Sequence, residues 1–411
     1  MSRVLTIMGS GETAPTMVKV HRMLLERVGA PAVLLDTPYG FQENADDISA
    51  RAQEYFAQSV GHPIAVASFP SADVDAVTHD RAMARVAAAA YVFAGPGSPT
   101  YALRQWVDTP LPGLLAGKLS VGGGVTFASA AALTLGIATV PVYEIYKAGE
   151  TPNWRDGLNL LEAATGLRAA VIPHYDNAEG GHHDTRYCYL GERRLAALEP
   201  DLPPGTFVLG VDEHTALVLD LDERRASIVG NGVVTVRVAG HSSTFASGEV
   251  VGFDALETAG GDEVVVHSPR AREPAGTARI ARSPLLDDAA RLEEEFKAAV
   301  GRRDVTGAVN AVLELDRVIV EWSADTLQSD EPDRARATLR SMIVRLGELA
   351  ELGARDPRAL LAPFVDALLE LRERARAGKD FALSDVVRER LEAAGIEVRD
   401  TPQGVTWQPR A

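Results

Sequence analysis

The sequence predicts an α/β protein in which a mostly parallel, doubly wound sheet is followed by a small helical domain ending in a β-hairpin. Two observations predict the sheet: β-branched runs alternate with amphipathic runs through the first 240 residues, and glycine-rich or polar residues follow several of these runs. A third observation predicts the helical part, because Ala, Leu, Glu and Arg dominate from about residue 285.

The early elements are expected to alternate between strand and helix. Predicted strands cover residues 4–8, 31–37, 64–69 and 89–95, and predicted helices cover residues 16–28, 46–60 and 80–88. Two later strands are expected to end near residues 125–127 and at residue 173. Residues 206–238 read as strands joined by short polar turns, so they are expected to finish the sheet as antiparallel edge strands or a hairpin.

The 411 residues allow at least two domains. We expect one over residues 1–256, a Gly-, Pro-, Arg- and Ala-rich linker over 257–284, and the helical domain over 285–411. In the last of these, an apolar stripe is expected to be a packing surface: Leu361, Phe364, Leu368 and Leu371. Asp380 is expected to cap a helix whose inner face is Leu383, Val387 and Leu391, and a hairpin is expected to follow Gly395.

Composition narrows the possible functions. The chain is 46% hydrophobic and 24% charged, which is typical of globular proteins. The net charge is −16, with acidic residues in excess in both halves, so non-specific nucleic-acid binding is not expected. The lone thiol, Cys188, cannot form an internal disulfide or a four-cysteine zinc site, which favours the cytoplasm. No apolar run is long enough for a membrane span, and we expect no membrane partner.

Residues that follow strands are the first candidates for chemistry, because ligands gather at the carboxyl ends of parallel strands. Ser129 follows a strand and begins a helix among small residues, where the N–H of Ala130 favours an oxyanion. His174 follows another strand and could accept the serine proton if the two strands are neighbours. Two carboxylates could orient the imidazole, Glu144 and Glu213, and spacing does not decide between them.

These residues occur in an order that resembles the dipeptidase E and cyanophycinase serine peptidases, whose fold is similar to that of class I glutamine amidotransferases. The ordered motifs span about residues 1–240: Gly-Ser-Gly-Glu, a Gly-rich turn after the fourth strand, Ser-Ala before Leu-Gly, Pro-His, and Gly-Val-Asp-Glu-His-Thr-Ala. The resemblance implies a serine hydrolase that cleaves a small peptide or amide, with Ser129 as nucleophile and His174 as base. The dipeptidase E pattern selects Glu144 as the acid, whereas the cyanophycinase pattern selects Glu213.

The resemblance also implies the rest of the site. The oxyanion would be held by the N–H groups of Gly97 and Ala130, because Pro96 has no N–H. The substrate would meet Gly9 and Glu12 of the first loop, and Arg186 and Arg193 would hold acidic substrate groups. The adjacent His182 and His183 have no obvious third ligand, so no metal site is expected, and no cofactor is expected.

The elbow departs from the family pattern, because Phe127 and Ala131 replace its two usual glycines around Ser129. An alternative alignment would put Gly122, Gly123 and Gly124 at the elbow and leave no nucleophile. Glutamine amidotransferases place a cysteine at this point, so glutaminase chemistry is disfavoured here. The rival hypothesis is therefore a catalytically silent, amidotransferase-like binding module.

The end of the chain is similar to the extreme C-terminus of cysteinyl-tRNA synthetase. The similarity rests on Lys-Asp-Phe-Ala at residues 379–382 and on Asp-Thr-Pro-Gln-Gly-Val-Thr-Trp at residues 400–407. It implies a tRNA-binding or protein-docking module over 285–411. The chain has neither the His-Ile-Gly-His nor the Lys-Met-Ser-Lys-Ser element of the synthetase, so it is not expected to aminoacylate tRNA by itself. The sequence does not specify the oligomeric state, and a homo-oligomer is one of the open possibilities.

Overall fold

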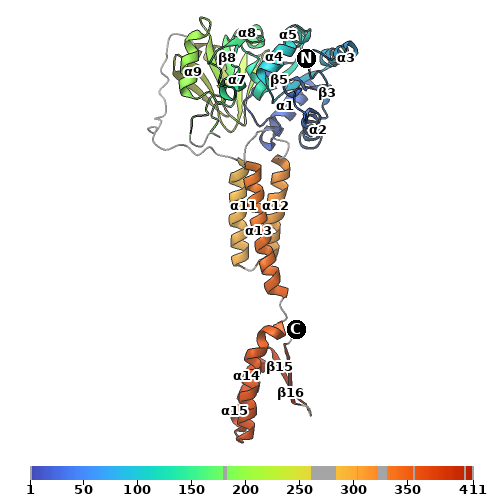
Figure 1. Ribbon diagram of the computed structural model, residues 1–411, viewed down its shortest axis with the longest axis vertical. Helices are drawn as coiled ribbons and strands as arrows, with labels where there is room; N and C mark the ends of the chain where they lie inside the picture. The colour runs from blue at the N-terminus through green and yellow to red at the C-terminus, as the bar shows by residue number, and fades with distance from the viewer. Residues whose placement is uncertain are drawn as a thin grey trace. The chain divides into compact units, whose positions relative to one another are not determined.

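The computed structural model describes residues 2–178, 183–260, 284–302, 304–322, 331–354, 357–401 and 404–409. Its N-terminal part is built on an eight-stranded sheet in the order β14-β11-β10-β1-β5-β4-β2-β3 (Figure 1). Five neighbouring strands are parallel: β1 (Arg3–Met8), β5 (Gly123–Ala128), β4 (Tyr91–Ala94), β2 (Ala32–Leu35) and β3 (Ala65–Ala67). The expected mostly parallel, doubly wound sheet is confirmed.

Alternation along the strands divides the apolar side chains between two faces of the sheet. In β1, Leu5 and Ile7 join one buried cluster, and Val4 and Met8 join the other. The second cluster contains apolar side chains of α1 (Val18–Val28) and α2 (Ala45–Tyr55), and the first contains those of α3 (Ala76–Ala88), α4 (Pro99–Trp106) and α5 (Leu111–Val121). Helices on both faces are what the near-continuous burial of the central strands requires.

The sequence predicts that the strands over 206–238 finish the first sheet, but only some of them do so. Two of them do, as antiparallel neighbours: β10 (Thr215–Asp220) beside β1 and β11 (Arg225–Gly230) beside β10, with β14 (Val250–Gly252) at the edge. The other two belong to a separate sheet in the order β13-β12-β9-β8. Its strands are β8 (Ala169–Ile172), β9 (Phe207–Val211), β12 (Val233–Val238) and β13 (His241–Ala246).

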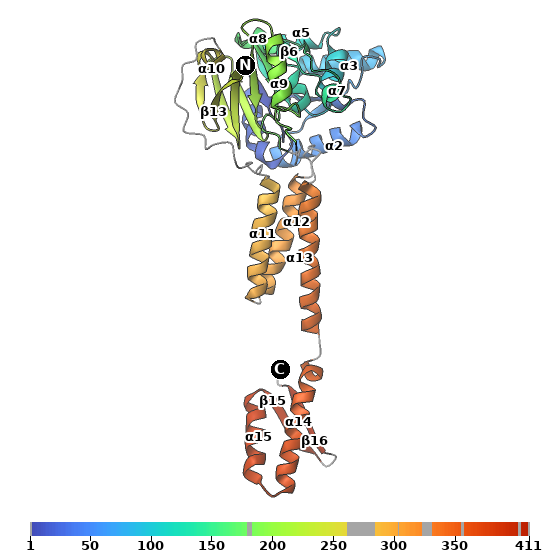
Figure 2. The same cartoon turned by 60° about the vertical axis from the view of Figure 1, so that its left-hand side comes forward.

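The second sheet has a buried face on each side. Ala169, Val171 and Leu209 belong to the larger cluster of the first sheet, whereas Ile172 and Val208 belong to a separate cluster. Short elements complete this part of the chain: α6 (Ser129–Leu133), β6 (Ala138–Thr139), α7 (Val142–Tyr146), β7 (Arg155–Asp156), α8 (Leu160–Thr165), α9 (Glu192–Leu198) and α10 (Phe253–Gly260). Figure 2 shows α10 and β13 on the side of the second sheet.

The first four residues of the expected linker belong to α10, and residues 261–283 lie outside the described residues. Three helices follow: α11 (Pro284–Gly301), α12 (Val305–Glu321) and α13 (Glu331–Ala354). The chain divides into two compact units, one formed by Met1–Arg291 and Glu314–Arg336, the other by Leu292–Leu313 and Ala337–Ala411. No helix of the described residues is long and apolar enough to cross a membrane.

The second unit ends in two helices and a hairpin. These are α14 (Pro357–Ala377), α15 (Phe381–Ala393), β15 (Ile396–Thr401) and β16 (Gly404–Pro409). The Asp380 side chain accepts a hydrogen bond from Leu383 N, and Val398 pairs with Trp407, so the expected cap and hairpin are confirmed. The hairpin and α15 share a buried cluster that includes Val387, Leu391 and Trp407.

Two expectations about these helices are wrong. Leu383 is exposed, and Ser384 occupies the buried position instead, because the face of α15 that contacts the cluster is rotated by one residue. On α14 the buried side chain that belongs to this cluster is Val365. The expected packing stripe is exposed over its whole length: Leu361, Phe364, Leu368 and Leu371.

Candidate functional site

Ser129 occupies a sharp strand-to-helix turn at the carboxyl end of β5. β5 ends at Ala128, α6 begins at Ser129, and the Ser129 φ angle is 48°, in the left-handed region that L-residues seldom adopt. Phe127 points away from the turn and packs against Trp106 in the core, with 5.6 Å between ring centroids. The serine itself is half-buried. Gly123 and Gly124 lie at the opposite end of β5, which excludes them from the elbow.

His174 comes from the second sheet, directly after β8 and Pro173. Its backbone N–H donates to Gly9 O across 3.3 Å, which ties its loop to the end of β1. On the other side, Cys188 N donates to His174 O across 3.1 Å. The two strand ends are thereby joined, and Ser129 Oγ lies 2.9 Å from His174 Nε2.

Glu213, in the loop between β9 and β10, holds the other ring nitrogen. Its Oε1 lies 2.8 Å from His174 Nδ1 and also accepts a hydrogen bond from Asn177 Nδ2 across 3.2 Å. The Glu213 backbone N–H donates to Asp176 Oδ1 across 2.8 Å. Residues 174 to 177 therefore supply both the imidazole and two side chains that fix the acid facing it.

The charges and hydrogen bonds among Ser129, His174 and Glu213 determine which atoms carry the protons. Burial raises the pKa of Glu213, but the hydrogen bond from His174, the imidazole charges and the bond from Asn177 outweigh burial, so the pKa lies below its usual value. An ionised Glu213 can only accept, so Nδ1 of His174 must carry the proton between them. Nε2 then presents its lone pair to the Ser129 hydroxyl, which is the arrangement of a general base beside a nucleophile.

Glu144, the alternative acid, is not placed at the imidazole. It lies on α7, and the described residues contain no hydrogen bond or ion pair between it and His174. Its Oε2 is buried without a hydrogen-bond partner in the described part of the chain.

Gly97 and Ala130 both lie close to the elbow. Ala131 N donates to Gly95 O across 3.1 Å, so the turn after β4 is joined to the start of α6. Gly97 has a φ of 133°, and a β-carbon there would lie 1.9 Å from Pro38 O, so only glycine fits. Within the described residues, neither the Gly97 N–H nor the Ala130 N–H is bonded to a backbone carbonyl. Both donors remain available to a ligand.

The residues of the loop that follows β1 have different roles. Gly9 uses both of its backbone groups inside the protein, because its N–H donates to Thr215 O across 2.9 Å and its carbonyl accepts from His174. A β-carbon at Gly9 would lie 2.0 Å from Asp212 O, so this glycine allows the loops to approach each other. The Glu12 side chain, in contrast, is buried, and a β-carbon at Gly95 would lie 2.9 Å from its Oε1.

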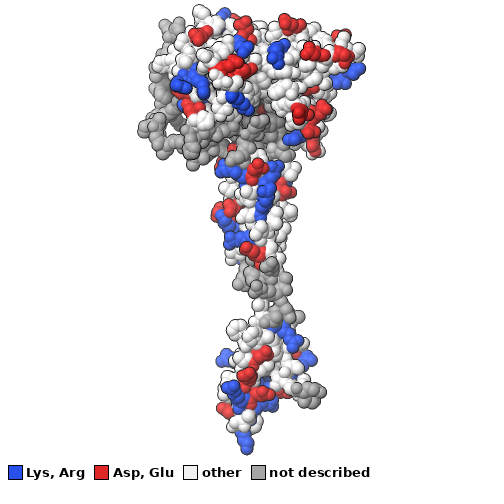
Figure 3. Space-filling view, in the orientation of Figure 1, with Lys and Arg blue, Asp and Glu red and all other residues white. Residues whose placement is uncertain are grey.

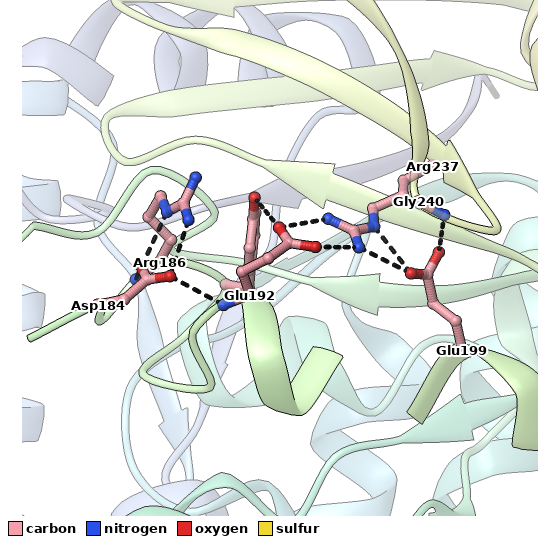
Figure 4. Close-up of polar contacts among 7 residues, drawn as sticks. Asp184, Arg186, Glu192, Glu199, Arg237 and Gly240 are labelled. Atoms are coloured by element: carbon pink, nitrogen blue, oxygen red, sulfur yellow. Dashed lines mark hydrogen bonds and ion pairs between the residues drawn. The ribbon is translucent and has the colours of Figure 1, made fainter. Parts of the chain in front are cut away.

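The two arginines expected at the substrate rim are not equivalent. Arg186 forms two hydrogen bonds with Asp184, of 2.8 and 2.7 Å, and the pair is partly exposed (Figure 4). Arg193 is exposed on α9, and among the described residues it forms no hydrogen bond or ion pair with Ser129 or His174. His182 lies outside the described residues, and the described residues contain no metal-binding group of three side chains.

Sequence reasoning missed Arg237, which organises the same region. Its guanidinium is almost fully buried and bonds to Glu192 and Glu199, with the closest ion pairs at 2.6 and 2.8 Å (Figure 4). The hydrogen bonds to Glu192 raise its pKa further above the usual range. Tyr187 O–H also donates to Glu192, across 3.0 Å. Asp176 and Asn177 were missed as well, although their position directly after His174 was a usable signal.

Comparison with known proteins finds similar proteins for both parts of the chain. Residues 358–407 match the family described as the cysteinyl-tRNA ligase anticodon binding domain. The cysteine–tRNA ligase of Latilactobacillus sakei is 37% identical over 128 residues, which are 30% of this chain and 26% of that protein. The enzyme of Nitratidesulfovibrio vulgaris is 34% identical over 131 residues, which are 28% and 26% of the two chains. The chain therefore spans about a quarter of the length of these relatives.

The fold comparison covers the other part. The crystal structure of a peptidase from an acI-B1 Actinobacterium matches with a TM-score of 0.50 and 21% identity, over 62% of this chain and 98% of that one. The N-terminal part thus shares the fold of that peptidase structure, and residues 358–407 are similar to the cysteinyl-tRNA ligase anticodon binding domain, as both sequence resemblances predict.

Proposed function

We propose that the protein is a serine hydrolase that cleaves a small peptide or amide with a Ser129–His174–Glu213 triad. The observation that carries the proposal is the continuous pair of contacts from Ser129 Oγ to His174 Nε2, 2.9 Å, and from His174 Nδ1 to Glu213 Oε1, 2.8 Å. These distances are within hydrogen-bond reach for a base and its nucleophile. The peptidase fold of the N-terminal part supports the same reaction class.

In the proposed reaction, Ser129 Oγ attacks the substrate carbonyl carbon while its proton moves to His174 Nε2. The resulting oxyanion would accept hydrogen bonds from Gly97 and Ala130. Collapse of this intermediate breaks the bond to the leaving group, which takes the proton from His174. Water then attacks the acyl-serine by the same route and releases the acid. Glu213 stays ionised throughout and stabilises the transient imidazolium.

The arrangement favours catalysis over a silent binding module. Phe127 and Ala131 take the place of the elbow glycines, yet Ser129 still adopts the positive φ of a nucleophile elbow. Such backbone strain is maintained only where the surrounding contacts enforce it, and it clusters at functional sites. A silent binding module does not need a half-buried serine whose hydroxyl faces an imidazole, as Ser129 does here.

The experiment is hydrolysis of a short-peptide library by the wild type and by Ser129→Ala, Glu213→Gln and Glu144→Gln. We expect Ser129→Ala to abolish turnover and Glu213→Gln to lower kcat/KM by roughly 10²–10⁴-fold, because the imidazole loses its orienting carboxylate. The kcat/KM of Glu144→Gln should stay within about 3-fold of the wild-type value, since this substitution changes at most one hydrogen bond. Equal turnover by wild type and Ser129→Ala would refute the proposal, and loss of activity in Glu144→Gln alone would reassign the acid.

We also infer that the C-terminal unit binds tRNA. The match to an anticodon-binding domain over 358–407 favours this over a purely protein-docking module. On the face shown in Figure 3, basic side chains are interspersed with acidic ones, so recognition would depend on specific contacts more than on overall charge. A tRNA partner also favours the cytoplasm as the place of action.

Binding of the full chain to a cysteine tRNA transcript tests this second function. We expect binding that weakens at least 10-fold when only the anticodon bases of the transcript are changed, because base contacts carry specificity. Equal affinity for the original and the anticodon-changed transcript, or no binding of either, would contradict tRNA recognition and favour a module that docks to a protein.

A further inference from the structure

The loop between β9 and β10 that carries Glu213 contains a second histidine, which takes no part in the proposed reaction. His214 directly follows Glu213 and is 7% exposed. Its φ angle is 51°, in the left-handed region that few residues other than glycine adopt. A strained backbone of this kind persists only where the surrounding contacts enforce it. The residues that contact His214 therefore also determine where the Glu213 carboxylate lies.

Residues that flank this loop hold its main chain. Asn231 N donates to His214 O across 3.0 Å, and a β-carbon built on Gly230 would lie 2.2 Å from that same oxygen. On the other side of the peptide, Thr215 Oγ1 donates to Glu213 O across 3.0 Å. These contacts fix the two carbonyl groups of the loop, and the His214 ring needs contacts of its own.

Residues from three separate segments contact the His214 ring. In the loop after β1, a β-carbon on Gly11 would lie 2.1 Å from His214 Nδ1, so a glycine is needed for the ring to approach this loop. Thr16 Oγ1, shortly before α1, lies 3.1 Å from the same nitrogen. The third residue is Trp322, which directly follows α12. Its ring centroid lies 5.2 Å from that of the imidazole at an interplanar angle of 72°, the edge-to-face geometry that aromatic rings favour.

Trp322 is itself a buried residue of the first compact unit. It is 6% exposed, and it lies in the segment Glu314–Arg336, which that unit contains together with Met1–Arg291. Val318 and Ile319, about one turn earlier on α12, are also buried. Because residues three and four apart share one face of a helix, the tryptophan continues this packed face. The indole therefore contacts His214 as part of a packed helix.

We propose that Trp322 is a positioning residue for the triad, which packs against the His214 ring and thereby holds Glu213 at His174. This inference rests on the proposed serine hydrolase function. Loss of the indole would let the His214 ring turn and its strained φ relax. Glu213 is the preceding residue, so its carboxylate would move away from His174 Nδ1, which it contacts at 2.8 Å. The hydrolase thus includes a residue far beyond the domain over 1–256 that the sequence predicts.

The path through Glu213 determines which kinetic constant responds. In the proposed reaction Glu213 orients the base and binds no part of the substrate. A displaced imidazole slows removal of the Ser129 proton, and small displacements are enough to do so. The maximal rate of reaction at Ser129 should therefore fall, while the concentration of reagent that gives half of this rate stays the same. Partial unfolding would instead lower the fraction of protein that reacts.

The experiment measures labelling of Ser129 by a small fluorophosphonate in the full chain: its maximal rate, its half-saturating concentration and its final extent. The variants are Trp322→Ala, Trp322→Phe and Trp407→Ala, the last a matched control because Trp407 is a tryptophan of similar burial in the second compact unit. His214→Asn, alone and combined with Trp322→Ala, tests the path, since asparagine tolerates a positive φ and has no ring. The midpoint of thermal unfolding shows that each variant is folded.

We expect Trp322→Ala to lower the maximal labelling rate by about 5-fold or more, within the range that an aromatic pair contributes, with the half-saturating concentration and the final extent unchanged. Trp322→Phe keeps an aromatic ring and should recover most of the rate, and Trp407→Ala should be labelled as the wild type is. His214→Asn should slow labelling as well. Adding Trp322→Ala to it should cost no more than about 2-fold, because the ring on which the indole acts is already gone.

Three outcomes would overturn the inference and leave the proposed hydrolase intact. A decrease smaller than 5-fold in Trp322→Ala would show that the indole does not position the triad. A lower final extent at an unchanged rate would make Trp322 a residue of folding alone. Losses that multiply in the double variant would show that Trp322 does not act through His214. A wild type that is not labelled at Ser129 would instead contradict the hydrolase itself, and this role of Trp322 with it.

Discussion

At the scale of single residues, the candidate site contains two neighbouring acidic residues whose pKa values shift in opposite directions. The imidazole stabilises the Glu213 carboxylate, whereas the Asp176 carboxyl accepts a hydrogen bond from the Glu213 backbone N–H and has no contact with the imidazole ring that lowers its pKa as strongly. Burial of the Asp176 carboxyl and the charge of Glu213 raise the Asp176 pKa to about 6. Asp176 is thus the group of this cluster that changes charge closest to neutral pH.

This predicts a pH-dependent effect of Asp176→Asn on stability. Because the folded-state pKa lies above the usual 3.8, the fold favours the protonated acid, so the stabilising contribution is present at low pH and is lost as the pH rises through about 6. The amide stays neutral and can still accept from Glu213 N. The Asp176 carboxyl faces the Glu213 N–H, but part of the residue is exposed to solvent, so screening limits the gain at pH 8 to about 1 kcal/mol, with none at pH 4. Urea denaturation at both pH values measures this, and an equal difference at both would contradict it.

The residues that sequence alone identified were those whose position depends on the end of a strand. Ser129 and His174 each follow a hydrophobic run, so their place at a sheet edge could be predicted. The choice between Glu144 and Glu213 could not, because the two acids lie in segments whose approach to His174 depends on tertiary packing. Arg237 could not be identified as a buried residue either. Successive side chains of a strand point to opposite faces, and an arginine among β-branched residues ordinarily lies on the face exposed to solvent.

At the scale of elements, the second sheet carries both His174, after β8, and Glu213, after β9, and these two strands are parallel neighbours. Periodicity could not predict this separate sheet, because buried strands of either sheet read as the same short apolar run. The exposed stripe on α14 was mispredicted for a related reason. Helical spacing shows that residues share a face, but not whether that face is covered.

The element that supports the second sheet is β12, through Arg237. Its guanidinium lies between Glu192 of α9 and Glu199, and is 3% exposed. Arg237→Ala is expected to lower the free energy of unfolding by about 3 kcal/mol, because the Glu199 carboxylate would remain buried without its charged partner, with only the Gly240 N–H donating to it. Arg186→Ala removes an exposed ion pair with Asp184 and should cost at most about 1 kcal/mol. Urea denaturation of the two variants compares them, and equal losses would contradict this role of Arg237.

At the scale of the whole molecule, the two proposed activities reside in different compact units, so they should respond to different substitutions. In the second unit, Arg372 bonds to both carboxylate oxygens of Asp400 in the hairpin, across 2.8 and 2.9 Å, and Arg372 is buried. Asp400→Asn should destabilise the hairpin by roughly 1–2 kcal/mol, as the charged hydrogen bonds are weakened.

We therefore expect Asp400→Asn to increase hydrogen exchange in β15 and β16 and to weaken tRNA binding, while hydrolysis of a short peptide stays unchanged. A matched control is Asp366→Asn, in which the side-chain oxygen can still accept from Trp407 Nε1. Loss of peptide hydrolysis in Asp400→Asn would show that the first unit depends on the second, contrary to this division of roles.

The central claim is that Ser129 is a nucleophile activated by His174, and fluorophosphonate labelling of the full chain with the site mapped by mass spectrometry tests it most directly. The account predicts that the wild type is labelled at Ser129 and that His174→Ala is labelled at least about 100-fold more slowly, since the base that removes the hydroxyl proton is gone. A wild-type protein that stays unlabelled, or one labelled at another serine, would contradict it.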